Sequence, residues 1–353
     1  MAVVNKRFET MIACKKRWRD YALLLFFISV FIVPACGSER RISFSGKTMG
    51  TTYHITAIAP AITSAARLQK KVDTRLQEIN NSMSTYIPAS EISRFNDFDL
   101  VGRPFAASDD FINVLAVGEK IYRLTGGAWD ATVWPLVKLW GFHLPVEQRR
   151  IPTPEQVAGA LKCVGYNKIQ LAPKAIIKKT ACVTLDLGSI AKGFGVDQIA
   201  VLLKENGITN FIIEIGGEIV ASGTKENGAD WNIGINLPEA YAPVDEVRRT
   251  LALSNRAVAT SGDYRNFFMV GDKRYCHVMD PRTGYPIETS VVSASVVSDT
   301  CTFADGLATA LMIMAPEKSV SLVNSLEDTE CLITVRGADG QLKDYYSKGF
   351  YSH

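Results

Sequence analysis

Ala304-Asp-Gly-Leu-Ala-Thr-Ala-Leu-Met-Ile-Met314 is the stretch on which the fold of this chain depends. After Gly306 it reads as a helix. Leu307, Leu311 and Met314 fall at i, i+4 and i+7, and this spacing predicts one buried stripe along the helix. We therefore expect this helix to lie against the core of the protein.

Asp305 and Thr309 lie four residues apart in that stretch, so a helix places both side chains on one face, one turn from each other. A carboxylate and a hydroxyl in this arrangement form two corners of a site for a hard cation such as Mg²⁺. The structural alternative is that Asp305 caps the helix, which is a common role for Asp, and that Thr309 is a buried hydroxyl. The rest of the chain decides between the two.

The charge of the chain is concentrated at its start. The sequence has 353 residues, enough for one large domain or two ordinary ones, and a formal net charge of +3. Residues 1–20 hold six basic and two acidic residues; removing them from the 39 basic and 36 acidic residues leaves 33 and 34. The remainder is nearly neutral and has no basic block or basic-aromatic stripe, so nothing in it suggests a nucleic-acid partner.

An uncharged apolar run of twelve residues, 22–33, follows the basic segment 15–19. This length is short for a membrane span and fits the core of a secretory signal peptide. The run leads into Ala35-Cys36, which resembles a bacterial lipobox, where the Cys is lipidated and becomes the new N-terminus. We expect residues 1–35 to be a lipoprotein signal peptide and 36–46 a short tether; an uncleaved signal anchor is the alternative.

Five cysteines remain outside the leader: Cys163, Cys182, Cys276, Cys301 and Cys331. They are odd in number, widely spaced and form no C-x-x-C pair, so the sequence implies neither a zinc site nor a full disulfide framework. Isolated cysteines in apolar contexts usually pack in the core, and the disulfide state of these five stays open.

Periodicity and capping residues predict the main elements of the body. Helices are expected at 64–82, in a short turn at 90–96, from Ser108 to Gly126, and after the capping box at Thr153. Strands are expected at 52–56 and 211–215, with 231–235 as a neighbouring strand. There is no repeat or long linker, and one compact catalytic body is the simplest interpretation.

Residues 183–193 read as a strand that turns into a helix. The glycines in this turn allow a ligand close to the backbone, and a helix N-terminus favours anions such as phosphate. Lys192 can place a positive charge there. The Gly193-Phe-Gly195 pattern is not a dinucleotide fingerprint, because the third Gly is missing and the order of strand and glycines is wrong.

A strand at 274–276 leads into a tight loop locked by Pro and Gly, 277–286, which His277 opens. A lone His is more often a structural residue than a catalyst. Because this one begins a rigid loop a short way before Asp305, we favour a functional role.

Four stretches carry a family resemblance: Lys47-Thr-Met-Gly-Thr51, Asp186-Leu-Gly-Ser-Ile-Ala-Lys-Gly193, His277-Val-Met-Asp-Pro-Arg-Thr-Gly-Tyr-Pro286 and Ala304-Asp-Gly-Leu-Ala-Thr309. In this order and spacing they resemble the FAD:protein FMN transferase family, also called ApbE. Residues 90–96 and 259–264 look similar to that family too. The resemblance implies an α+β fold of the T-fold-like kind for residues 36–353, as a single compact catalytic body after the signal peptide.

The resemblance also implies a role for individual residues. Asp305 and Thr309 match metal-binding side chains, and Ser189 matches a position that gives a backbone carbonyl to Mg²⁺. His277 matches the histidine at the reacting centre. The positions that match the lining of the FAD site are Met49, Tyr86, Ala128, Trp129, Asp130, Asp186, Lys192 and Met279.

The reaction implied is attack by a threonine hydroxyl of an acceptor protein on the FMN-side phosphorus of FAD, with AMP leaving. Mg²⁺ and Lys192 would neutralise charge, and either His277 or Asp280 would take the proton. With the lipid anchor at Cys36, this places an enzyme on a membrane of the bacterial envelope, facing the periplasm. Two alternatives stay open: an FAD pyrophosphatase that uses water, and a non-catalytic flavin-binding lipoprotein, which would not need the Asp305–Thr309 pair.

Overall fold

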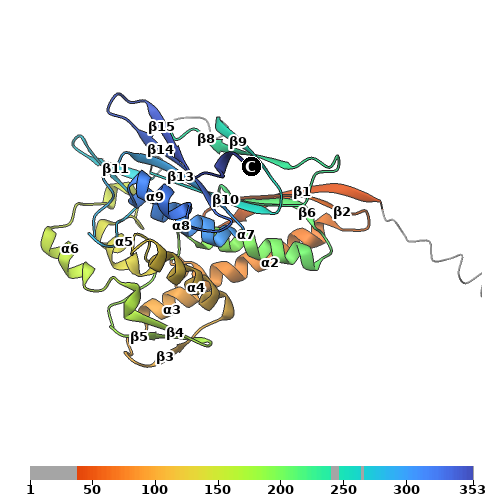
Figure 1. The fold of residues 1–353 in the computed structure, drawn as a ribbon. Coiled ribbons are helices and arrows are strands. Elements are labelled where there is room, and N and C mark those ends of the chain that lie inside the picture. Colours follow the sequence, from red (N-terminus) through yellow and green to blue (C-terminus); the bar gives the residue numbers. More distant parts are fainter. Residues whose placement is uncertain (1–37, 240–245, 264–265, 353) are drawn as a thin grey trace, which may run out of the picture. The chain divides into compact units, whose positions relative to one another are not determined.

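The structure is a computed structural model, and it describes residues 38–239, 246–263 and 266–352 (Figure 1). Within the described residues, contacts group 41–59 and those from 63 to 352 into one compact unit. Apart from residues 38–40 and 60–62, the features analysed below lie in this unit, as expected for a single catalytic body. The predicted signal peptide and Cys36 lie outside the described residues. Among the helices that are described, none is long and apolar enough to cross a bilayer.

An eight-stranded sheet runs through this unit in the order β1-β2-β6-β7-β10-β13-β14-β15. Neighbours from β2 to β15 pair antiparallel. The strands span β1 (Glu39–Thr48), β2 (Thr51–Pro60), β6 (Asn210–Ile215), β7 (Glu218–Ser222), β10 (Arg256–Gly262), β13 (Val291–Ser298), β14 (Glu330–Arg336) and β15 (Leu342–Tyr346). The mixture of this sheet with helices confirms the predicted α+β class.

Three helices cover one face of the sheet: α2 (Ala65–Met83), α7 (Ala191–Glu205) and α8 (Cys301–Ile313) (Figure 1). Apolar side chains of α2 and α7 pack on β2 and β6 in one cluster, and those of α8 join a second cluster with β10, β13 and β14. The hairpin of β8 (Trp231–Asn236) and β9 (Val247–Leu253) packs on the other face. Because both faces are covered, every residue of β13 is buried.

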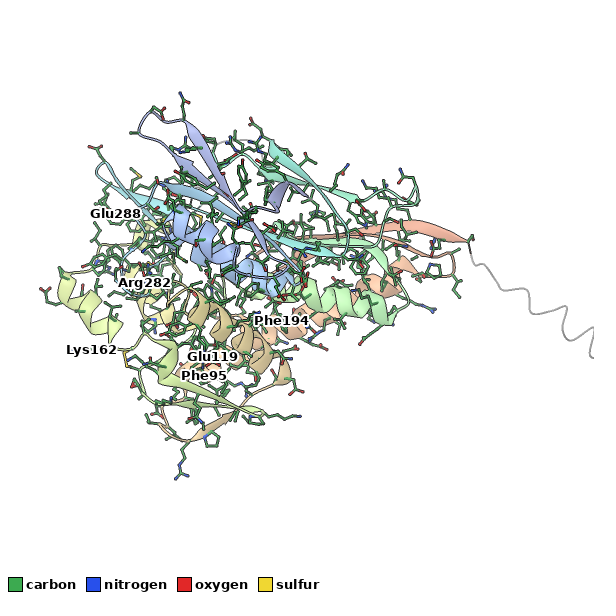
Figure 2. The ribbon with its side chains drawn as sticks, in the orientation of Figure 1. Phe95, Glu119, Lys162, Phe194, Arg282 and Glu288 are labelled. Carbon is green, nitrogen blue, oxygen red and sulfur yellow. A yellow bond between two sulfur atoms is a disulfide. The ribbon has the colours of Figure 1, made fainter. Side chains whose placement is uncertain are left out.

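A second group of elements completes the helical side. It comprises α3 (Glu91–Asp97), α4 (Asp109–Leu124), α5 (Trp134–Trp140), α6 (Pro154–Leu161), α9 (Pro316–Val323), and the small sheet of β3 (Pro104–Ala106), β5 (Ala175–Lys178) and β4 (Ile169–Ala172). Phe95 of α3, labelled in Figure 2, is fully buried and makes edge contacts with Phe105 and Phe111 at 5.4 and 6.3 Å between ring centroids. The hairpin of β11 (Phe267–Val270) and β12 (Lys273–Cys276) leads into the loop that His277 opens.

The helices with capping signals form where the sequence predicts them. Ser64, Ser90 and Ser108 cap α2, α3 and α4, and Thr153 forms the predicted capping box of α6. Each cap accepts a hydrogen bond from an N–H that the first turn would otherwise leave without a partner.

Four predictions about elements are wrong. Residues 39–46 are expected to lie in a short tether, but they belong to β1 and pair in the sheet. Helix α8 begins at Cys301, with Thr300 at its N-cap, so Asp305 lies inside the helix and does not cap it. Strand β8 pairs with β9 in a separate hairpin and is no neighbour of β6. Residues 183–187 belong to no sheet.

The segment 183–187 is extended, but its backbone pairs with groups outside any strand. The side chain of Asn96 exchanges two hydrogen bonds with the backbone of Leu185, at 2.7 and 2.9 Å. The N–H of Asp186 donates to the carbonyl of Ala131. These contacts satisfy the backbone without a ladder, so the apolar alternation that resembles a strand reflects burial of Val183, Leu185 and Leu187 alone.

Candidate active site

A cavity of about 860 Å³ opens where α7, α8, the 128–134 segment and the loop after β12 meet. Twelve of the residues predicted for the site line it: Met49, Tyr86, Ala128, Trp129, Asp130, Asp186, Ser189, Lys192, His277, Met279, Asp305 and Thr309. Segments more than 250 residues apart in the sequence therefore contribute to one site. Asp280 is not among the described lining residues.

Asp305 and Thr309 both face this cavity from α8. Asp305 is only 2 % exposed, and its Oδ2 accepts a hydrogen bond from the backbone N–H of Gly193 at 2.9 Å. The Thr309 hydroxyl lies 2.9 Å from the hydroxyl of Ser261 on β10. Sequence reasoning missed Ser261, which orients the Thr309 hydroxyl from the neighbouring strand.

The close crossing of α7 over α8 depends on Gly193. A Cβ at this position would collide with the backbone carbonyl of Cys301 and would lie 2.8 Å from Cβ of Asp305. The missing side chain lets the Gly193 N–H reach the Asp305 carboxylate. At the start of α8, the carboxylate of Asp197 on α7 accepts hydrogen bonds from the N–H groups of Cys301 and Thr302, at 2.9 and 2.8 Å. The two helices are thus joined at two points by charge-assisted hydrogen bonds.

The donor set at this crossing suits Mg²⁺. In a helix the Gly193 N–H would donate to the carbonyl of Ser189, four residues earlier, but here it donates to Asp305. The Ser189 carbonyl therefore accepts no backbone hydrogen bond among the described residues. The Ser189 hydroxyl accepts from the indole N–H of Trp129 at 2.9 Å. A buried carboxylate, a hydroxyl and a free carbonyl line the same cavity, and these hard oxygen ligands are few enough to leave room for phosphate and water.

Lys192 lies between two carboxylates at the start of α7. Its Nζ is 3.0 Å from Oε1 of Glu218 and 3.7 Å from Oδ1 of Asp305. Burial opposes the charged ammonium, but the two carboxylates outweigh it and raise the pKa of Lys192, so it carries its charge at neutral pH. Burial opposes the ionised form of Glu218 and raises its pKa, while the adjacent Lys192 ammonium favours the carboxylate and counteracts that rise.

Glu218 is a site residue that sequence reasoning missed. It is the first residue of β7, directly after the Gly216-Gly217 turn, and lines the cavity. Both glycines adopt positive φ, 60° and 103°, and a Cβ at Gly216 would lie 2.8 Å from the Thr51 side chain. The only available signal was that glycine pair, which points to a close approach of backbones but not to the carboxylate that follows.

His277 opens the loop after β12, as predicted, and its ring has a defined tautomer. Its Nδ1 lies 3.1 Å from the backbone carbonyl of Asn266, whose oxygen also accepts the His277 backbone N–H. A carbonyl oxygen accepts only, so Nδ1 carries the proton and Nε2 of the neutral ring is free to accept one. The imidazole faces the open side of the cavity, yet the surrounding protein desolvates it and, with the charges of Lys192 and Arg149, lowers its pKa.

The other candidate base, Asp280, is engaged elsewhere. Its two carboxylate oxygens accept from the guanidinium of Arg282 at 2.9 and 2.8 Å, and Oδ1 also accepts the Arg282 N–H. These bonds hold the loop 280–284 in its turn. The geometry favours His277 as the base.

Asp130 and Asp186 organise the cavity wall made by the segments 128–134 and 186–189. The carboxylate of Asp130 accepts hydrogen bonds from the N–H and hydroxyl of Thr132 and from the N–H of Tyr166, at 2.8, 2.6 and 3.0 Å. The carboxylate of Asp186 accepts from the N–H of Gly188 at 2.7 Å. Burial raises the pKa of both carboxyl groups. Both residues therefore shape the loops of the wall as well as lining the cavity.

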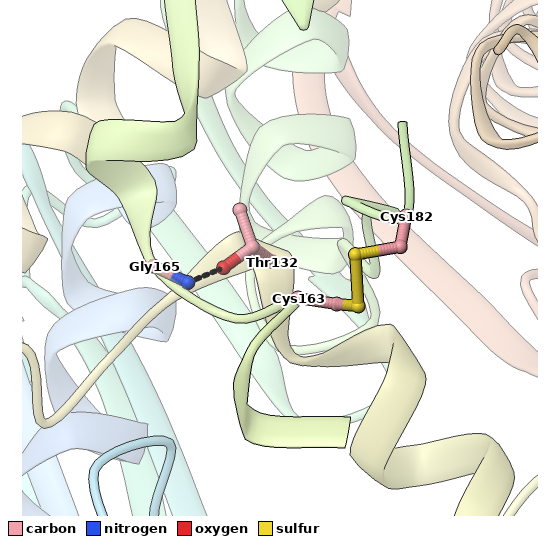
Figure 3. The surroundings of a disulfide bond; sticks show 4 residues. All are labelled: Thr132, Cys163, Gly165 and Cys182. Carbon is pink, nitrogen blue, oxygen red and sulfur yellow. Dashed lines mark hydrogen bonds between the residues drawn. A yellow bond between two sulfur atoms is a disulfide. The ribbon is translucent and has the colours of Figure 1, made fainter. Parts of the chain in front are cut away.

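A disulfide that the sequence did not predict joins Cys163 to Cys182 (Figure 3). Two residues after Cys163, the N–H of Gly165 donates to the hydroxyl of Thr132, which in turn donates to Asp130. The other three cysteines outside the leader are free. They are also buried, as expected for isolated cysteines in apolar contexts. The bridge thus connects the segment around Gly165, which supports Asp130 through Thr132, to the segment that leads into Asp186.

Loss of this disulfide is expected to destabilise the protein. Because the bridge closes a loop of 19 residues, replacing both Cys163 and Cys182 by Ser should lower the free energy of unfolding by about 3 kcal/mol in urea denaturation. Reduction of the wild type with dithiothreitol should give the same loss. Dithiothreitol should have no effect on the double variant; an equal loss there would contradict the assignment.

Comparison with known proteins agrees with this geometry. The model of the ApbE family matches residues 49–333. An FAD:protein FMN transferase of Vibrio cholerae is 38% identical over 331 residues, covering 93% of this chain and 97% of that protein. One of Haemophilus influenzae is 41% identical over 297 residues, covering 82% of this chain and 86% of that protein.

Solved structures give the same result. The flavin transferase ApbE of Vibrio cholerae superposes with a TM-score of 0.81 at 38% identity, covering 89% of this chain and 99% of the other. The apo form of the flavinyl transferase ApbE of Pseudomonas stutzeri gives 0.80 at 32% identity, covering 89% and 96%. From the family match, these relatives and the shared fold, we conclude that the chain belongs to the ApbE family and is a transferase.

Proposed function

We propose that this protein moves the FMN group of FAD onto a threonine hydroxyl of an acceptor protein in the bacterial envelope, with Mg²⁺ as cofactor and AMP as the leaving group. The observation that carries the proposal is the meeting of three parts in one cavity. They are the Asp305–Thr309 pair, the ammonium of Lys192 and the free Nε2 of His277.

The start of α7 suits the pyrophosphate of FAD. The dipole of a helix N-terminus favours anions, and Lys192 adds a full positive charge at the cavity wall. Met49, Trp129 and Met279 supply apolar lining for the flavin and adenine rings. The cavity volume of about 860 Å³ lies within the range that accommodates large cofactors.

Ser189, Asp305 and Thr309 would hold the metal, which when bound would neutralise charge on the pyrophosphate. Such transfers require alignment and charge neutralisation more than covalent help from the protein. In the proposed step, the threonine oxygen of the acceptor forms a bond to the FMN-side phosphorus. The bond from that phosphorus to the bridging oxygen breaks, and AMP leaves with the electron pair. His277 accepts the hydroxyl proton at Nε2.

Two other functions would use parts of the same site. A pyrophosphatase would send water to the same phosphorus and release FMN with AMP. A non-catalytic flavin-binding protein would have no need for the buried Asp305 carboxylate beside the Thr309 hydroxyl.

The dependence of AMP release on acceptor tests the proposal. The purified protein is incubated with FAD and Mg²⁺, with and without solubilised envelope proteins, and AMP and free FMN are measured by chromatography. Transfer predicts AMP in excess of free FMN only when acceptor is present, and EDTA should stop AMP release. Equal amounts of AMP and free FMN in both samples would identify a hydrolase, and no AMP in either would identify a binding protein.

The envelope location is part of the proposal. The leader at 1–35 supports it from the sequence. The Cys163–Cys182 bridge supports it independently, because disulfides persist in oxidising compartments such as the periplasm and are rare in the cytosol.

Replacing Cys36 by Ser is expected to release the protein from membranes or to leave the leader attached, since the lipid would have no attachment site. Membrane fractionation and N-terminal mass analysis of both proteins would measure this. A wild-type protein that still begins within residues 1–35 when purified from cells would contradict the lipobox assignment.

A further inference from the structure

Glu218 holds one oxygen at Lys192 and leaves the other without a partner. The residue is 3 % exposed and lines the cavity. Its Oε1 lies 3.0 Å from Lys192 Nζ, while its Oε2 is buried and has no hydrogen-bond partner within the described part of the chain. A buried carboxylate with an unpaired oxygen is costly to the fold, so its presence calls for an explanation.

The ammonium of Lys192 is shared unequally. It lies 0.7 Å closer to Glu218 than to Asp305, as the 3.0 and 3.7 Å separations show. Asp305 Oδ2 is already used by the Gly193 N–H, which leaves Oδ1, the oxygen that faces Lys192, as the one on which a cation would depend. Any movement of the ammonium from Glu218 toward Asp305 would occupy that oxygen and repel the metal.

We propose that Glu218 is a positioning residue that holds the Lys192 ammonium away from Asp305 and so keeps Asp305 Oδ1 available to the metal. The inference rests on the proposed function, because it assumes a divalent cation at Asp305. Held toward Glu218, Lys192 still lines the cavity, where its ammonium can contact the pyrophosphate of bound FAD. Glu218 contributes without binding the metal itself, and outer groups of this kind commonly change metal affinity by 10–100-fold when they are replaced.

Glu218→Gln tests this directly. The amide keeps the size of the side chain but removes the charge that holds Lys192, so the ammonium should move onto Asp305. We expect at least a tenfold rise in the Mn²⁺ concentration needed for half-saturation at saturating FAD. Binding is followed by the EPR signal of free Mn²⁺, which prefers the same oxygen ligands as Mg²⁺. This readout requires no turnover and no acceptor.

Removing the lysine should reverse the effect. Lys192→Met alone should leave metal affinity at or above that of the wild type, and the double variant Lys192→Met/Glu218→Gln should recover most of the affinity lost in Glu218→Gln. Glu214→Gln is a matched control, since Glu214 is the penultimate residue of β6, on the other side of the same glycine turn, and contacts His54 and the Gly217 N–H. It should bind Mn²⁺ as the wild type does.

Near-UV circular dichroism and thermal midpoints establish that each variant is folded. If Glu218→Gln does not fold, Glu218→Asp replaces it. Its shorter carboxylate lies farther from Lys192, so Mn²⁺ affinity should fall by a smaller factor. Unchanged Mn²⁺ binding in folded Glu218→Gln or Glu218→Asp would overturn the inference, as would a double variant no better than Glu218→Gln. Failure of the wild type to bind Mn²⁺ with FAD would instead overturn the proposed metal-dependent function.

Discussion

Replacing Asp305 by Asn is expected to lower the rate of FMN transfer by about 10³-fold while the fold remains intact. The amide oxygen can still accept the Gly193 N–H, so the α7–α8 crossing keeps its hydrogen bond. The formal negative charge is lost, and Asp305 is the one anionic side chain among the three proposed metal ligands. Loss of a preorganised group that neutralises charge at the reacting phosphate typically costs 10²–10³-fold.

The neighbouring ligand provides the comparison. Thr309→Ala should be milder, because water can replace a neutral hydroxyl and Ser261 remains in place beside it. Raising the Mg²⁺ concentration should restore much of the transfer activity of Thr309→Ala and little of the activity of Asp305→Asn. Circular dichroism spectra of both variants should match the wild type. Normal transfer by Asp305→Asn at limiting Mg²⁺ would contradict the metal assignment.

Replacing His277 by Gln is expected to lower kcat by about 10²–10⁴-fold, the usual contribution of a positioned base, with a smaller change in KM for FAD. Glutamine can still donate to the Asn266 carbonyl but cannot take a proton. In the wild type, desolvation by the surrounding protein and the charges of Lys192 and Arg149 lower the His277 pKa. The ring is active when neutral, so the rate should stay high through neutral pH. It should fall only as pH drops below the ordinary histidine range, through that lowered pKa.

Asp280→Asn distinguishes the two candidate bases. Its carboxylate is held by Arg282 and is not part of the described cavity lining. This variant should keep the acid limb of the pH–rate profile and most of kcat, with some loss of thermal stability from the weakened loop. Asp280 would be the general base if Asp280→Asn lost as much kcat as His277→Gln does and His277→Gln kept the pH–rate profile of the wild type.

The sequence predicts those parts of the fold that depend on local chemistry. Caps such as Ser64 and Ser108 define helix starts because they satisfy N–H groups within one turn. The i, i+4 spacing of Asp305 and Thr309 predicts their common face correctly even though α8 begins several residues earlier than expected. That error arose because the N-terminal cap of α8 is completed by Asp197, a residue more than 100 positions away.

The parts that the sequence does not predict depend on contacts distant along the chain. The extended segment 183–187 alternates like a strand, but its backbone is satisfied by Asn96 and Ala131, and no local pattern shows this. Pairing of Cys163 with Cys182 required α6 and the segment before Val183 to be side by side. Glu218 becomes a site residue only because the fold brings the first residue of β7 to Lys192 at the start of α7.

Mass analysis of flavinylated acceptors tests the central claim most directly. The purified protein, FAD and Mg²⁺ are incubated with solubilised envelope proteins, fluorescent bands are excised after denaturing electrophoresis, and the intact mass and modified residue are determined. We predict a gain of one FMN less one water, joined through a phosphoester to a threonine, and no gain with Asp305→Asn. Release of AMP and free FMN in equal amounts, with no envelope protein gaining mass, would contradict the account.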